Sequence, residues 1–142
     1  MPRYTLPITN SPTRDGRPVT SRHIPFYVAL ETAADAWTIA LSEFCAATLL
    51  PTDVAVVHVT SDFRHELFVG EVTVDVSLQR VGTSSITFVM ELIQSGRSAG
   101  TIEFVVAQVD QSRIHAVALT PAQRAALETI PRTIPGGKAG AG

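Results

Sequence analysis

The chain is poor in cysteine, in aromatic residues and in runs of basic charge. Cys45 is its single cysteine, so it can form no internal disulfide and no cysteine zinc site, which fits a reducing compartment. Aromatic residues make up only 6% of the 142 residues and apolar residues 45%, so the expected core is aliphatic. A net charge of −2 without a basic run argues against nucleic acid as the main partner.

Long hydrophobic runs are also missing. No stretch approaches eighteen apolar residues without a charge, and prolines among polar residues leave no room for a signal-peptide core in residues 1–20. These absences predict a soluble, cytoplasmic protein that does not enter a membrane. The length predicts a single domain over residues 1–130, and the glycine-rich residues 131–142 are expected to form a flexible tail.

One long helix is predicted between residues 24 and 44. Apolar residues recur there at helical spacing and fill most of the other directions, so we expect a helix that is buried on most sides. Pro25 fits the first turn of this helix, with Thr20 or Ser21 as its cap. Its few charged residues, Glu31 among them, are therefore the ones that call for an explanation.

Several strands are predicted around this helix. A first short strand fits residues 3–9, and the polar stretch that follows it reads as a loop. Alternating apolar and polar residues then predict long strands over residues 54–62, 71–81, 85–94 and 99–109. Ser95-Gly96-Arg97 is the predicted hairpin turn between the last two of them. Thr120-Pro121 predicts the start of a short last helix. The fold class is thus α+β, a bent antiparallel sheet around one central helix.

Three short patterns within this order carry a resemblance. Phe63 is followed by Gly70-Glu71 at the start of a strand, and Val81-Gly82-Thr83-Ser84-Ser85 turns into the next strand. The chain resembles the hotdog-fold acyl-CoA thioesterases, in particular the 4-hydroxybenzoyl-CoA thioesterase-like group. The resemblance implies a hotdog fold, and a homodimer or dimer of dimers with its sites at the dimer interface. It also implies an acyl-CoA or acyl-carrier-protein substrate, with CoA or phosphopantetheine as part of the substrate and no separate cofactor. No metal site is expected, because His58, His65 and Asp62 are not spaced to converge.

Two carboxylates match the placements that this family uses for catalysis. Asp15 lies in the loop before the helix and, with Gly16 and His23, resembles the family's loop motif, although the usual Asn pair is missing. Its alternative is a tight Asp-Gly turn. Glu31 lies in a Leu-Glu-Thr-Ala segment eight residues after His23 and resembles the helical carboxylate of another branch. Burial there would raise its pKa toward that of a useful base, and the alternative is a structural glutamate.

Other residues are candidates for substrate contact. His23 is expected to polarise the thioester carbonyl or hold a water, with helix capping as the alternative. By the resemblance, the turn formed by Gly82, Thr83, Ser84 and Ser85 meets the pantetheine arm; the alternative is a plain polar turn. Arg64 is a candidate for the CoA phosphates, or else a solvated side chain.

Other functions remain open from the sequence. A non-catalytic hotdog module that binds an acyl thioester or serves as a dimerising subunit is the main alternative. A hotdog dehydratase would need an Asp–His pair that the sequence does not display. A cystatin-like or lipocalin-like ligand binder is a further alternative. It can be distinguished from a hotdog fold by whether the sheet wraps the helix completely.

Overall fold

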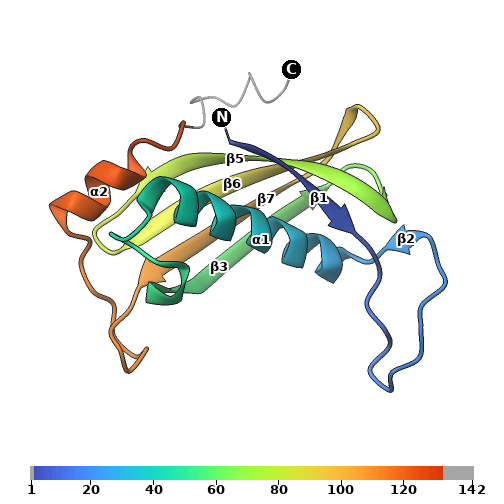
Figure 1. Cartoon of the computed structure of the whole chain (residues 1–142), viewed down its shortest axis with the longest axis horizontal. Coiled ribbons are helices and arrows are strands. Elements are labelled where there is room, and N and C mark those ends of the chain that lie inside the picture. Colours follow the sequence, from blue (N-terminus) through green and yellow to red (C-terminus); the bar gives the residue numbers. More distant parts are fainter. Residues whose placement is uncertain (1, 133–142) are drawn as a thin grey trace.

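The computed structural model describes residues 2–132. One five-stranded antiparallel sheet, of order β1-β5-β6-β7-β3, carries helix α1 (Phe26–Cys45) across one face (Figure 1). Its strands are β1 (Arg3–Ile8), β3 (Val54–Phe63), β5 (Gly70–Val81), β6 (Ser85–Gln94) and β7 (Arg97–Gln108). A two-stranded sheet and two short helices complete the fold: β2 (His23–Ile24), β4 (Leu67–Phe68), the 3-10 helix η1 (Pro51–Asp53) and α2 (Pro121–Leu127). The predicted α+β architecture is confirmed.

The core lies between α1 and the inner face of the sheet. Alternate residues from Val72 to Leu78 in β5 and from Ile86 to Leu92 in β6 are buried against it, as the alternation predicts. The Trp37 ring of α1 stacks on Phe88 of β6 with ring centroids 5.6 Å apart, and it also contacts Phe104 of β7 at 6.3 Å. This aromatic group fixes the middle of α1 on the sheet, and so the place where the helix begins.

The outer face of β5 is less exposed than its alternating pattern suggested. Asp75 and Ser77 are 9% and 6% exposed, although we expected their face to be wet. Strand β1 pairs alongside, and the Arg3 guanidinium forms two hydrogen bonds with the Asp75 carboxylate, of 2.6 and 2.8 Å. An ion pair thus compensates the carboxylate for its burial.

The start of α1 differs from the prediction. The helix begins at Phe26, and Pro25 is its N-cap, without a side-chain cap. The expected caps, Thr20 and Ser21, were wrong, because the Ser21 hydroxyl instead accepts a hydrogen bond from the His23 N–H at 3.1 Å. Within residues 2–132, no bonded partner exists for the N–H groups of Phe26 and Tyr27. The helix therefore begins with free donors and the positive end of its dipole.

The sheet does not wrap α1 completely. Four residues at helical spacing, Tyr27, Glu31, Asp35 and Ser42, are exposed along the side that faces away from the sheet. We expected a helix buried on most sides, and in the single chain α1 is buried less than that, because one sheet covers only one side of it. Within the described residues, no helix has the length and apolarity to cross a membrane.

The C-terminal segment closes the other end of the core. Thr120 caps α2 as predicted, accepting the Gln123 N–H at 3.1 Å, and the Gln123 amide donates to the Gln108 side chain at 2.7 Å. Pro131 and Arg132, which we expected in the tail, lie along β5, where the Leu78 N–H donates to the Pro131 carbonyl at 2.8 Å. The rest of the expected tail, residues 133–142, lies outside the described residues.

Candidate active site

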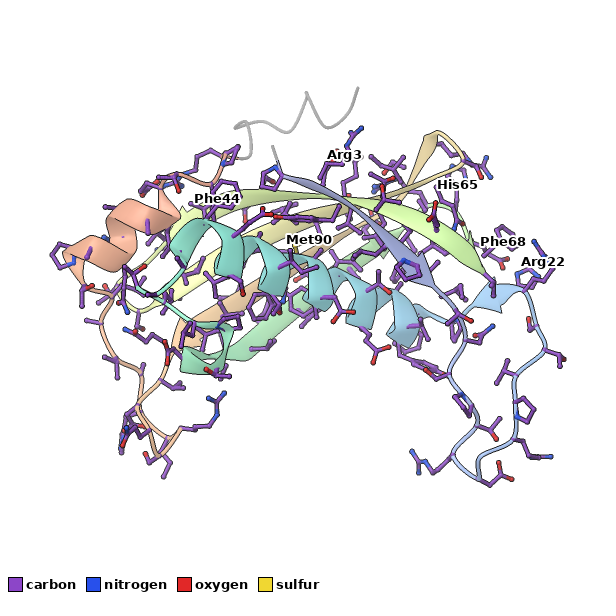
Figure 2. The ribbon with its side chains drawn as sticks, in the orientation of Figure 1. Arg3, Arg22, Phe44, His65, Phe68 and Met90 are labelled. Atoms are coloured by element: carbon purple, nitrogen blue, oxygen red, sulfur yellow. The ribbon has the colours of Figure 1, made fainter. Side chains whose placement is uncertain are left out.

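A pocket of about 330 Å³ lies where α1 begins. Apolar side chains of β2, α1, β3 and β4 form much of its wall, and the segment between β3 and β4 adds three charged or polar ones; the lining is Ile24, Phe26, Ala29, Phe63, Arg64, His65, Glu66 and Leu67. In Figure 2, His65, Phe68 and Arg22 lie at this end of the molecule, far from Phe44 near the other end of α1. The pocket thus offers an apolar wall, nearby helix-end donors and a charged rim.

Two short strands assemble this pocket from distant parts of the sequence. In the β2–β4 pair, His23 lies opposite Phe68 and Ile24 opposite Leu67. The Gln94 side chain, at the end of β6, bonds both the N–H and the carbonyl of Phe68 at 2.9 Å. The end of the main sheet therefore holds β4, and β4 holds the residues just before α1.

His23 and Glu66 meet across these strands. The Nδ1 atom of His23 bonds the Oε1 atom of Glu66, and the His23 ring rests on Phe68 with centroids 5.1 Å apart. The two side chains are 61% and 68% exposed. His23, a predicted site residue, therefore lies beside the pocket and contacts one of its lining residues.

Arg64 is held at the rim of the pocket. Its guanidinium donates to the hydroxyls of Ser98 and Thr101, both at 2.7 Å, and to Asp62 at 3.1 Å. The backbone N–H of Arg64 also donates to the carbonyl of Ala99 in the neighbouring strand β7. The side chain is still 40% exposed, so it offers a fixed positive charge to an incoming anion.

Asp15 does not lie among the residues that line the pocket. It occupies a tight turn in which Gly16 has a φ of +88°, on the loop between β1 and β2 that projects from the sheet (Figure 1). The Thr13 hydroxyl and then the Arg17 guanidinium, 3.0 Å away, hold the pKa of Asp15 below its usual range. In the single chain, Asp15 therefore has the geometry of a tight Asp-Gly turn, which was the alternative to a catalytic role.

Glu31 is also absent from the pocket lining. Five helix positions separate it from Phe26, which places it roughly 140° round the helix from that pocket residue. It is exposed, and no other residue of the range 2–132 forms a hydrogen bond or ion pair with its side chain. The expected burial of Glu31 is therefore wrong for the single chain.

The turn from Gly82 to Ser85 lies at the opposite end of β5 from the pocket. Its backbone is tied to the C-terminal segment, since Arg124 donates to the Gly82 carbonyl at 2.6 Å and the Leu119 N–H to the Thr83 carbonyl at 2.9 Å. At about 3.3 Å per residue, the twelve residues of β5 separate this turn from β4 by roughly 35 Å. Within one chain, the turn cannot serve this pocket.

Glu66 is the pocket residue that the sequence reasoning missed. It lies in the turn-like segment after Phe63, and nothing in its neighbours marks it as different from a solvated turn glutamate. Only the β2–β4 pairing brings it to His23, and two-residue strands leave no alternating pattern to find. Among the described residues, no group of three metal-ligating side chains comes together.

Cys45 bears on any assay that follows thiol release. It is 1% exposed at the end of α1, and burial raises the pKa of its thiol to about 11. We therefore expect native protein to react negligibly with a disulfide reagent such as DTNB over several minutes at pH 8, because the thiolate is the attacking species. Protein unfolded in guanidinium should release one equivalent of chromophore. Rapid reaction of the native protein would contradict the buried position.

An antiparallel sheet carrying one long helix across one face is the architecture of the hotdog fold. The family described as the thioesterase superfamily matches residues 27–101, more than half of the chain, and the chain belongs to that superfamily. Thioester hydrolysis is the activity for which this superfamily is named. The cystatin-like and lipocalin-like alternatives are wrong.

Solved structures agree on the fold. A thioesterase from Thermus thermophilus, complexed with coenzyme A and Zn, is 20% identical with a TM-score of 0.74, over 89% of this chain and 91% of that one. A thioesterase superfamily protein from Jannaschia sp. CCS1 is 18% identical, with a TM-score of 0.72 over 91% and 92%. A 1,4-dihydroxy-2-naphthoyl-CoA thioesterase from Synechocystis is 14% identical, with a TM-score of 0.68 over 88% and 93%. Among curated proteins, none matches the sequence.

Proposed function

We propose that this protein hydrolyses an acyl-CoA, or an acyl-carrier-protein thioester, in the pocket at the start of α1. The observation that carries the proposal is the meeting of two features at this pocket. The first turn of α1 has unpaired N–H groups, and the segment from Arg64 to Glu66 adds charged side chains beside them. No cofactor enters the reaction, and the supply of acyl-CoA together with the free thiol of Cys45 supports a cytoplasmic location.

The chemistry needs few groups because a thiolate leaves easily. A carboxylate takes a proton from water while the water oxygen bonds to the acyl carbon. The N–H groups of Phe26 and Tyr27, at the positive end of the helix dipole, stabilise the negative charge that develops on the carbonyl oxygen. The C–S bond then breaks, and the sulfur takes the proton, which leaves a carboxylic acid and the free thiol.

The free edge of β3 suggests how a second copy completes the site. This ten-residue strand ends the sheet, and Val56, Val57 and Val59 are 46%, 59% and 38% exposed along it. Phe63 ends the same strand and lines the pocket, so a chain that pairs with β3 also reaches the pocket. We propose a homodimer with joined sheets, alone or within a dimer of dimers.

The remaining predicted site residues fit this dimer better than the single chain. The turn of Ser84 and Ser85, too far from its own pocket, would meet the pantetheine arm of a substrate bound elsewhere in the assembly. Glu31 lies on the exposed side of α1, and Asp15 lies on the projecting loop. Both would need a second copy or a loop movement to reach a thioester, and their catalytic roles stay predictions.

Arg64 is expected to bind the phosphates of CoA. Arg64→Ala should raise KM for acyl-CoA about tenfold with kcat nearly unchanged, because the guanidinium contacts a part of the substrate that does not react. The matching N-acetylcysteamine thioester carries no phosphate, so its kinetics should stay the same. Arg97→Ala, in the exposed β6–β7 hairpin, is the control. An equal effect on both substrates would show that Arg64 only supports the fold.

The test of the proposed function is thiol release from acetyl-, hexanoyl-, palmitoyl-, benzoyl- and phenylacetyl-CoA. Turnover of any of these would establish the activity and give its acyl class. The alternative is a module that binds acyl thioesters without hydrolysing them, and the positions of Asp15 and Glu31 outside the pocket favour it. Folded, dimeric protein that binds an acyl-CoA but releases no thiol would establish that alternative.

A further inference from the structure

We propose that Glu66 is the catalytic carboxylate of this site and that His23 is the residue that positions it. The inference rests on the proposed thioesterase function and names its base. The sequence pointed to Asp15 and Glu31, but Glu66 is the carboxylate among the residues that line the pocket. It lines the pocket together with Leu67 and with Phe26 of the first turn of α1, whose backbone N–H is one of the proposed oxyanion donors.

The two oxygens of Glu66 have different surroundings. Oε1 bonds the Nδ1 atom of His23, whereas no residue in the range 2–132 bonds Oε2. Neighbouring carboxylates are placed otherwise: Asp62 pairs with Arg64, and Glu71 lies beyond β4, outside the pocket lining. One oxygen is thus held in place, and the other can accept a proton from water.

The position of His23 is itself fixed by several contacts. The backbone N–H of His23 donates to the Ser21 hydroxyl at 3.1 Å, and the backbone carbonyl of His23 accepts a hydrogen bond from the Asn10 side-chain amide at 3.0 Å. The same Asn10 amide donates to the Ser21 carbonyl at 2.7 Å, and Phe68 supports the ring. These contacts join both ends of the projecting loop, so the loop has the role of holding His23 against Glu66.

The proton balance is complete without another group. The Glu66 carboxylate takes a proton from the attacking water and returns it to the leaving sulfur as the C–S bond breaks. Glu66 is then ionised again, and the products are the carboxylic acid and the thiol. One proton thus moves from water to Glu66 and then from Glu66 to the sulfur, and the step needs no oxidant or reductant.

Glu66→Gln tests this role on the acyl-CoA that the wild type hydrolyses fastest. Glutamine keeps the size and polarity of the side chain but cannot take the proton, so kcat should fall at least about 100-fold while KM changes less than threefold. Glu66→Asp keeps a carboxylate and should recover part of the loss. Glu71→Gln removes a nearby exposed carboxylate and should behave as wild type.

His23 variants separate positioning from a purely structural contact. His23→Ala should lower kcat about tenfold, and His23→Asn, whose amide can donate near the Nδ1 position, should recover most of it. Wild-type kcat in Glu66→Gln, with only a lower Tm, would overturn the proposal and leave a structural bond between β2 and β4. The proposal would also be overturned if the Glu66→Gln variant kept wild-type activity while Asp15→Asn or Glu31→Gln was inactive. These results would leave the thioesterase function intact, whereas a silent wild type would overturn both.

Discussion

In the proposed dimer, Ser61→Pro is expected to separate the two copies into 15.2 kDa monomers and to lower kcat/KM at least about 100-fold. The Arg64 N–H donates to Ala99 on β7, and N–H groups alternate in direction along an antiparallel strand. The Ser61 N–H therefore points to the free edge of β3. Proline removes this donor and places a ring at the edge, but leaves the bonds between β3 and β7 in place.

In the proposed dimer a second copy lies beside Phe63 at the edge of the pocket and completes the substrate site, which is why the loss of the dimer should also lower activity. Sedimentation velocity and thiol release, measured on the same samples, would check both. Ser61→Ala is the matched control and should stay dimeric and active, since it keeps the N–H. A Ser61→Pro protein that stays dimeric would place the interface elsewhere, and an active monomer would show that one chain holds the whole site.

Phe88→Ala is expected to lower the free energy of unfolding by about 3–5 kcal/mol, which is a large part of the stability of a domain of this size. Phe88 is fully buried and stacks on Trp37, so its removal leaves a cavity between α1 and β6. Since Trp37 is the single tryptophan, its fluorescence reports both the unfolding curve and the new cavity. Denaturant unfolding followed by this signal would measure the loss.

Phe88→Leu is the control for the cavity, because a leucine fills part of the space and should cost clearly less. Activity in the folded fraction should also fall in Phe88→Ala, since the stack fixes α1 on the sheet and the proposed oxyanion donors belong to α1. If the unfolding free energy changes by less than about 1 kcal/mol, the Trp37–Phe88 contact does not hold the helix as described.

The sequence predicted those parts of the fold whose cause is local. Strands β5 and β6 follow from alternation at positions such as Val74 and Met90, and α2 follows from Thr120 and Pro121. The start of α1 was harder to predict. The sequence allowed Ser21 to cap the helix, but its hydroxyl instead accepts a hydrogen bond from the backbone N–H of His23. Tertiary contacts, not propensity, decided between these two uses.

The site could be predicted only in part. His23 and Arg64 were predicted as candidates, and they lie beside and in the pocket, but their bonding partners come from far along the chain and their roles stay predictions. Glu66 reaches His23 over 43 residues through a two-residue strand pair, which no periodic pattern announces. Burial of Glu31 was wrong for a related reason. An apolar helix pattern does not tell which side its own sheet covers and which side is left for a second copy.

The most direct test of the central claim is hydrogen–deuterium exchange of the protein, measured with and without a non-hydrolysable thioether analogue of its best acyl-CoA substrate. We expect slower exchange in peptides that cover residues 24–29 and 63–67, where the first turn of α1 and the charged rim form the pocket. Peptides from the projecting loop tip, around Asp15, should change little. Saturating analogue that leaves residues 24–29 and 63–67 unprotected, while another region slows, would contradict the assignment of the active site.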